Sequence, residues 1–83
     1  MYYEKVYVKI IAEFARFGGL TPKIIVWDND EKFNVDCVKD VSCAPCKSGG
    51  VLPERYTVTV LGQLKYLYYE KDKRRWFVER EIV

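Results

Sequence analysis

Three cysteines are the first residues in this sequence with the chemistry for a metal site. Cys43 and Cys46 form a Cys-x-x-Cys pair, and Cys37 precedes them in the chain. Tetrahedral zinc needs four ligands, and such a pair is normally completed by a second Cys-x-x-Cys or by two histidines. This chain contains no histidine. A fourth ligand would therefore have to come from Asp36, from Asp40 or from a second copy of the chain.

Redox chemistry of the thioredoxin type is the other use of such a pair. It places the Cys-x-x-Cys at a helix N-terminus, where the helix dipole lowers the thiol pKa, whereas this pair lies in a predicted loop between strands. An odd number of cysteines without a leader sequence is typical of reduced thiols in a cytoplasm. We therefore expect Cys37, Cys43 and Cys46 to be free thiols, with no cofactor and no metal. An intersubunit metal site and redox chemistry are the alternatives.

Enzymatic catalysis lacks its usual residues. Without histidine, the commonest general base and triad member is missing. The sequence has no Gly-x-Ser-x-Gly and no glycine-rich phosphate loop followed by a helix. Asp28-Asn29-Asp30 resembles the start of a calcium loop, but Lys32 stands at the fifth position, so a hairpin turn is expected there. We expect a protein that is not an enzyme.

Basic and aromatic residues gather in the C-terminal half. Residues 1–41 carry 6 basic and 7 acidic side chains, whereas residues 42–83 carry 8 and 5. Small barrels often bind single-stranded nucleic acid by stacking bases on exposed aromatics beside a basic groove. Lysines and arginines at a hairpin turn also serve simply to keep a sheet edge soluble, and Glu70 and Asp72 dilute the positive charge. The residues for which we predict contact roles are Tyr66, Tyr68, Lys73, Arg74 and Arg75.

A binding surface for another protein is the favoured use of this hairpin. A partly open sheet leaves a strand edge that can accept a strand from a partner, and tyrosine-rich surfaces are typical of interface cores. Tyr2, Tyr3, Ile11 and Tyr69 are predicted to face outward. We expect a protein partner or a homodimer, with single-stranded nucleic acid as the alternative partner. Steep loss of affinity with salt would mark the nucleic acid.

Period-two alternation of apolar and polar residues predicts the fold. Val6, Val8 and Ile10 alternate with polar neighbours, as do Tyr56 and Val58 later in the chain. Short turns separate the segments, and no helical pattern of ten residues occurs, so an antiparallel meander follows. A bulge is expected near Lys39-Asp40, and residues 42–53 are the one substantial loop. The six predicted strands are residues 4–16, 23–27, 32–41, 55–61, 64–70 and 75–83.

A flat sheet of this length would leave an apolar face in water and long edges exposed. Curling into a small, partly open SH3-like barrel, whose interior is filled by side chains, avoids both. The chain of 83 residues has room for a single core, so residues 1–83 are expected to form one domain. The predicted interior consists of Val6, Val8, Ile10, Phe14, Ile25, Trp27, Phe33, Val35, Tyr56, Val58, Val60, Leu67, Trp76 and Val78.

Composition excludes several other classes. A hydrophobic content of 49% with a net charge of +2 argues against disorder and against a strong general field. Charged residues interrupt every apolar stretch, so no membrane span is expected. Lys5, Lys9 and Glu13 break the N-terminal segment, which therefore lacks the apolar run of a secretory signal. A cytoplasmic protein is expected.

Several segments together resemble one family. They are Gly19-Leu20-Thr21-Pro22, Ile25-Val26-Trp27, Phe33-Asn34-Val35-Asp36, Arg55-Tyr56-Thr57-Val58, Tyr66-Leu67-Tyr68-Tyr69-Glu70 and Trp76-Phe77-Val78-Glu79. The order resembles a group of short uncharacterised bacterial proteins that are small all-β barrels, sometimes encoded near translesion DNA polymerase genes. The resemblance implies a barrel, a bacterial cytoplasm and a link to nucleic acid, and it carries no site residues. This sequence departs from the pattern at Asp28-Asn29-Asp30-Glu31, which lacks a hairpin glycine, and in the cysteine-bearing loop.

Overall fold

The computed structural model describes residues 2–14, 19–46, 49–50 and 52–82, and every regular element in this part of the chain is a β-strand. No helix long and apolar enough to cross a membrane occurs among these residues. The seven strands are β1 (Tyr2–Phe14), β2 (Leu20–Val26), β3 (Lys32–Asn34), β4 (Cys37–Cys43), β5 (Glu54–Val60), β6 (Gln63–Glu70) and β7 (Arg75–Ile82).

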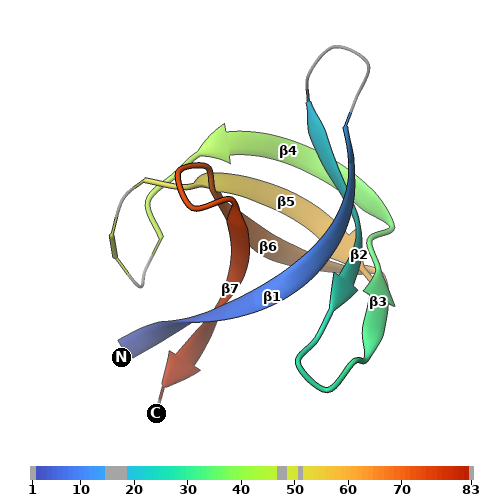
Figure 1. The fold of residues 1–83 in the computed structure, drawn as a ribbon, viewed down its shortest axis with the longest axis horizontal. Helices are drawn as coiled ribbons and strands as arrows, with labels where there is room; N and C mark the ends of the chain where they lie inside the picture. The colour runs from blue at the N-terminus through green and yellow to red at the C-terminus, as the bar shows by residue number, and fades with distance from the viewer. Residues whose placement is uncertain (1, 15–18, 47–48, 51, 83) are drawn as a thin grey trace.

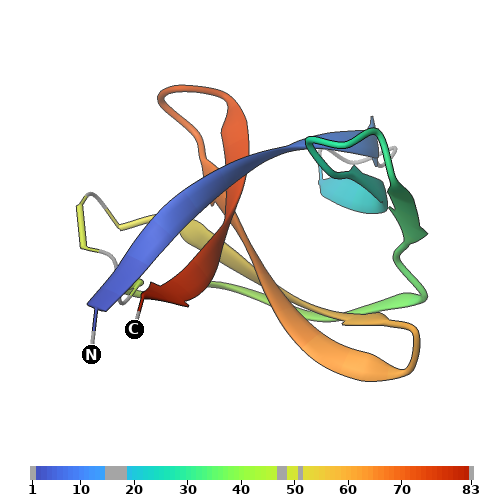
Figure 2. The ribbon, with the colours of Figure 1, turned by 90° about the horizontal axis from the view of Figure 1, so that it is seen from below.

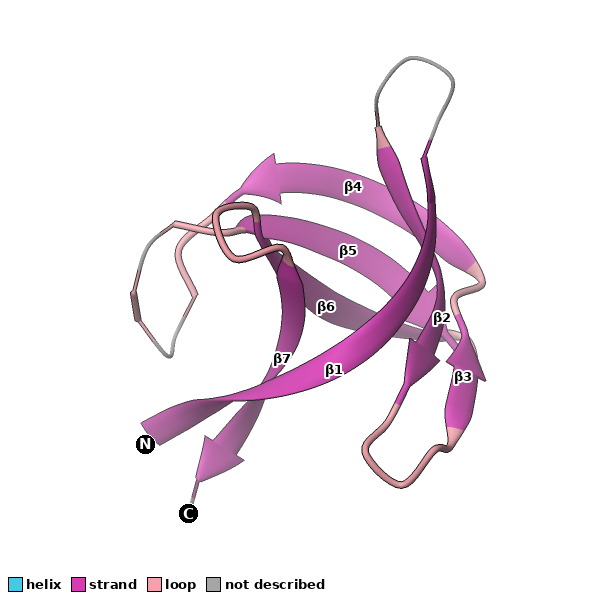
Figure 3. Cartoon of the chain, in the orientation of Figure 1, coloured by secondary structure: helices cyan, strands magenta, loops and turns pink. Residues whose placement is uncertain are grey.

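The strands form a single antiparallel sheet in the order β3-β2-β1-β7-β6-β5-β4. Consecutive strands pair along two meanders, β1 to β3 and β4 to β7, and the long β1 joins them by pairing with β7 through Tyr2–Val8 and with β2 through Lys9–Phe14. Because strands twist, the sheet curls into a half-barrel (Figures 1 and 3). The predicted fold class, a small and partly open all-β barrel, is confirmed.

The structure has seven strands where six are predicted, because residues 32–41 do not form one continuous strand. The backbone N–H of Val35 donates to Lys23 on the β2 side, whereas the N–H of the next residue, Asp36, donates to Thr59 on the β5 side. The chain changes partners at this step and bends, so β3 and β4 lie at opposite ends of the strand order although they are adjacent in sequence. The expected bulge is present, since the β4–β5 register shifts between Val38 and Asp40.

The tight turns use left-handed backbone positions. In the turn after β2, Asp30 has a φ of 65°, and the side chain of Asn29 accepts a hydrogen bond of 3.0 Å from the N–H of Glu31. Asn and Asp tolerate this region and form such local bonds, which confirms the expected polar hairpin turn. The β5–β6 hairpin turns through Leu61 and Gly62, both with positive φ.

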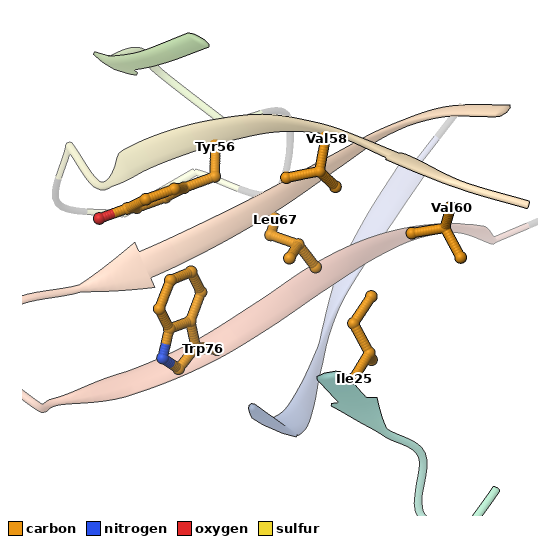
Figure 4. Packing of buried hydrophobic residues seen from close by; sticks show 6 residues of the cluster. All are labelled: Ile25, Tyr56, Val58, Val60, Leu67 and Trp76. Atoms are coloured by element: carbon orange, nitrogen blue, oxygen red, sulfur yellow. The ribbon is translucent and has the colours of Figure 1, made fainter. Parts of the chain in front are cut away.

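The core fills the concave side of the sheet and consists mainly of the predicted residues. Tyr56 and Trp76 pack at one end with ring centroids 4.9 Å apart, and Val60 and Ile25 lie at the other (Figure 4). Burying each of these large side chains contributes about 1.5–3 kcal/mol. The buried cluster is Ile25, Tyr56, Val58, Val60, Leu67 and Trp76. Val8, Ile10, Trp27, Phe33, Val35 and Val78 pack against it, half-buried.

Two side-chain placements differ from the prediction. Phe14 is 84% exposed rather than interior, because β1 runs past the half-barrel and its last residue pairs only with Leu20 at the end of the protruding β1–β2 hairpin (Figure 1). Tyr69 is packed against the core rather than outward, with its ring 4.7 Å from that of Trp76. Alternation from the inward-facing Leu67 places Tyr69 on the same face.

Candidate functional site

The predicted contact residues of the C-terminal hairpin do not share one surface. Tyr68 is only 5% exposed and stacks on Phe77, with ring centroids 5.1 Å apart, so its face is unavailable to a base or a partner. Tyr66 is exposed, but it lies toward the opposite end of β6 from the turn that carries the basic residues. Lys73, Arg74 and Arg75 are exposed on that turn and at the start of β7.

The positive charge of this turn is largely balanced by acidic neighbours. The Arg75 Nε donates to Glu70 Oε1 at 3.0 Å, and the Lys73 Nζ lies 3.8 Å from Glu70 Oε2. Lys71 similarly lies 3.7 Å from Glu54. Acidic side chains therefore interrupt the basic surface of this turn, and nucleic-acid binding at this hairpin stays a prediction.

Glu70 is the centre of a network that ties three strands together. It is 8% exposed and accepts hydrogen bonds from Arg75 on β7 and from the Tyr7 hydroxyl on β1, while Arg75 also donates to that hydroxyl at 2.9 Å. Burial raises the pKa of the Glu70 carboxyl, but the hydrogen bonds from Tyr7 and Arg75 and the charges of Arg75 and Lys73 lower it below its usual value overall. The network stabilises the charged carboxylate and fixes this end of the β6–β7 pair.

The cysteines do not assemble into a metal centre. Cys37 and Cys43 stand at the two ends of β4 and are exposed, and Cys46 contacts the carbonyl of Gly49 at 3.2 Å. Within the described ranges, no three cysteine or acidic side chains come close enough to hold a metal ion. Among the described residues, Cys37, Cys43 and Cys46 form no disulfide.

A different feature, an open seam, separates the other ends of β6 and β7. The two strands pair only through Tyr68–Phe77, Tyr69–Trp76 and Glu70–Arg75. Beyond these pairs β6 follows β5, and β7 follows β1 to its last described residue. Figure 2 shows the β5–β6 hairpin turning away from β7 after the two cross. The seam is defined here as the opening between residues 63–67 of β6 and residues 78–82 of β7.

The backbone of β6 points unpaired polar groups into this seam. Val60 and Gln63 form the closing pair of the two-residue β5–β6 hairpin. From this pair onward, successive residues of β6 direct their N–H and C=O groups alternately toward β5 and away from it. Lys65 and Leu67 direct their N–H and C=O groups toward β5, whereas Leu64 and Tyr66 direct theirs toward the seam. Among the described residues neither Leu64 nor Tyr66 has a ladder partner on that side. The seam therefore presents a short exposed strand edge.

A cavity of about 770 Å³ opens along the seam. Its inner wall is apolar and belongs to the half-barrel core: Ile25, Trp27, Phe33, Val60, Leu67 and Val78. Its outer wall includes Tyr3, Pro45, Arg55, Tyr66, Tyr68 and Glu79. Cavities of this size and lining are typical of ligand-binding sites. Because β6 and β7 are not paired here, the cavity extends from the surface to the hydrophobic core.

Exposed apolar side chains surround the hairpin tip beside the seam. Leu61 is 80% exposed, Leu64 is 57% exposed and Tyr66 is 45% exposed. Leu61 also has a φ of 52°, a left-handed conformation that costs a residue other than glycine roughly 1–2 kcal/mol and that Asn or Gly normally takes in such a turn. An exposed leucine in a strained turn position lowers stability without improving packing.

The outer lip of the seam carries Arg55 and Glu79, and Glu31 and Lys65 also line the cavity. The Arg55 guanidinium lies over the Tyr66 ring, 4.8 Å from its centroid, and Arg55 Nε is buried without a hydrogen-bond partner among the described residues. Across the seam, Tyr68 hydrogen-bonds to Glu79. Burial, the charge of Glu79 and this bond together raise the pKa of Tyr68 to about 12, partly opposed by Arg55. Tyr68 therefore remains a neutral hydrogen-bond donor.

Of the predicted contact residues, Tyr66 belongs to the seam, and the buried Tyr68 lies beside it and lines the cavity. Arg55, Leu61 and Leu64 were not predicted as site residues. The sequence does mark Leu61 as unusual, because Leu-Gly stands at a hairpin tip where Asn-Gly is the usual pair. Comparison of the chain with protein-family models, with curated proteins and with solved structures finds no match in any of the three.

Proposed function

We propose that this protein is a non-enzymatic binding module that captures an extended segment of a partner protein in the seam. The observation that carries the proposal is the three-pair β6–β7 ladder, which leaves the β6 edge and the apolar cavity open side by side. A strand added to this edge would hydrogen-bond to the backbone of Leu64 and Tyr66. Its alternate side chains would enter the cavity.

The chemistry of the seam favours a polypeptide over other occupants. A small apolar ligand would fill the cavity but leave the backbone groups of Leu64 and Tyr66 without partners. A strand would fill the cavity with its apolar side chains, and its backbone donors and acceptors would pair with those of Leu64 and Tyr66. A strand that runs antiparallel to β6, the more stable arrangement, runs parallel to β7, since β6 and β7 are themselves antiparallel.

Proline at position 64 tests this proposal, because it removes the N–H that points into the seam and leaves the β5 ladder intact. We expect Leu64→Pro to fold and to lose at least about tenfold in affinity for a strand-forming peptide, as expected for a lost hydrogen bond at a docking edge. Leu64→Thr keeps the N–H and removes a similar apolar area, so it is the matched control and should bind within about threefold of the wild type.

The probe is a fluorescein-labelled nonapeptide, Thr-Val-Thr-Val-Glu-Val-Thr-Val-Thr, measured by fluorescence anisotropy, with circular dichroism to confirm folding of both variants. Equal loss in both variants would show that the side chain of Leu64, and not the strand edge, makes the contact. No binding to the wild type would overturn the proposal. A labelled single-stranded oligonucleotide provides the comparison, and tighter binding of the oligonucleotide that weakens steeply with salt would favour the nucleic-acid alternative instead.

A further inference from the structure

On the outer lip of the seam, Arg55 has a buried side-chain nitrogen without a hydrogen-bond partner among the described residues. Arg55 projects from β5 on the outer face, opposite to the inward-facing Tyr56, and reaches across β6 to the ring of Tyr66. The guanidinium therefore lies beside Tyr66, whose backbone points into the seam, and Arg55 lines the seam cavity. The flat guanidinium group lies over the face of the Tyr66 ring.

No carboxylate among the described residues pairs with Arg55. The ion pairs of the described chain involve Glu4, Glu13, Glu54 and Glu70, each with another cation. The buried Nε of Arg55 also has no hydrogen-bond partner among these residues. Buried donors normally have a hydrogen-bond partner. A buried donor without one lowers stability, and the cost in free energy is largest when the donor belongs to a charged group.

We infer that the partner segment carries a carboxylate, an aspartate or glutamate side chain, that binds the Arg55 guanidinium. The inference rests on the proposed function and identifies the chemistry of its partner. Arginine matches a carboxylate with two parallel N–H donors, and such charge-assisted pairs are the strongest hydrogen bonds in proteins. A carboxylate at this position supplies hydrogen-bond acceptors to the Arg55 guanidinium.

Strand alternation gives the sequence pattern of the partner. A residue of the added strand that faces outward beside Tyr66 meets Arg55, whereas the residues before and after it face inward to Leu67 and Val78 in the cavity. The partner pattern is therefore apolar–acidic–apolar. Glu79 lies on the β7 side of the lip and accepts the hydrogen bond of Tyr68, and the ion pairs of the described residues do not include one between Glu79 and Arg55.

Two nonapeptides that differ in one residue test the inference. They are the valine–threonine peptide with a central glutamate described above and its counterpart with a central glutamine. We expect the wild-type protein to bind the glutamate peptide about 10- to 100-fold more tightly, the range of a charge-assisted hydrogen-bond pair. Arg55→Gln should remove this preference and leave binding of the glutamine peptide nearly unchanged, and Arg55→Lys should restore only part of it.

Lys23→Gln is the matched control, because it removes one positive charge from β2, at a residue that pairs with Glu13 and lies outside the cavity lining. It should leave the preference for glutamate intact. A preference lost equally in Lys23→Gln would mean a general charge effect and would overturn the inference. Equal binding of both peptides to the wild type would overturn it too, while the proposed function would stand. If neither peptide binds, both this inference and the proposed function are wrong.

Discussion

The two ends of the β6–β7 pair use the same two strands in opposite ways. At the turn end, three backbone pairs, the Glu70 network and stacked aromatics hold the strands together. At the other end the strands separate, the apolar core borders the cavity and the exposed side chains include Leu61, Leu64 and Tyr66. The difference indicates that stability is concentrated at one end, which leaves the other end open for binding.

The turn end owes its stability to a second apolar cluster on the convex face of the sheet. Phe77 is 1% exposed and lies between the rings of Tyr68 and Tyr7, with Lys5 5.1 Å from its centroid. The outer face is thus covered as well as the inner one at this end. The hydrophobic inner wall of the seam has no such cover. An added strand would cover this wall, as the aromatic cluster covers the outer face at the turn.

The largest expected effect belongs to the aromatic cluster. Phe77→Ala should lower the free energy of unfolding by about 3–5 kcal/mol, because it removes a fully buried ring and leaves a cavity between two tyrosines. Leu64→Ala, in the seam, should change it by less than about 0.5 kcal/mol, as for other exposed positions. Urea unfolding of both variants measures the contrast. Similar losses in the two variants would mean that the seam is packed in solution.

The next effect concerns pH. Because the folded-state pKa of Glu70 is lowered, its contribution to stability is present above the unfolded-state pKa and is lost as pH falls through the folded-state value. Glu70→Gln should reduce the free energy of unfolding at pH 7 by about 1.5–3 kcal/mol, the range of hydrogen bonds to a charged group. The gap from the wild type should close on acidification.

The control for Glu70 is Glu81→Gln, which removes an exposed carboxylate near the end of β7. Its stability should follow the wild type at every pH within about 0.5 kcal/mol. Urea midpoints at pH 7, 5 and 3 give the three curves. A constant difference between wild type and Glu70→Gln across this range would show that the carboxylate charge does not contribute.

The smallest effect is a gain of stability at the open end. Leu61→Asn should raise the free energy of unfolding by about 0.5–1 kcal/mol, because asparagine tolerates the left-handed backbone of the β5–β6 turn. The same change should weaken binding of the glutamate nonapeptide, since it removes an apolar side chain from the rim. Thermal denaturation and anisotropy measure the two effects. A more stable variant with unchanged affinity would remove Leu61 from the proposed site.

The fold could be predicted because alternation records which side chains face the core. Tyr56, Val58 and Val60 alternate in the sequence and are buried in the structure. The break at Val35–Asp36 could not be predicted, because Cys37 continues the alternation of Phe33 and Val35 in the sequence, whereas in the structure Cys37 is exposed and Val38 packs against the core. The seam could not be predicted for a different reason, because a paired and an unpaired strand edge carry the same side-chain pattern. Tyr68 was predicted to be exposed because nothing local shows that Phe77 packs against its ring.

Amide hydrogen exchange of β6 in the free protein tests the open seam most directly. Lys65 and Leu67 donate to β5, so their N–H groups should exchange about 100-fold or more slowly than those of Leu64 and Tyr66, which point into the seam. Addition of a peptide that binds should slow exchange at Leu64 and Tyr66 alone. Uniform protection from Leu64 to Leu67 without peptide would show that β6 and β7 are paired along their length, and it would contradict the account.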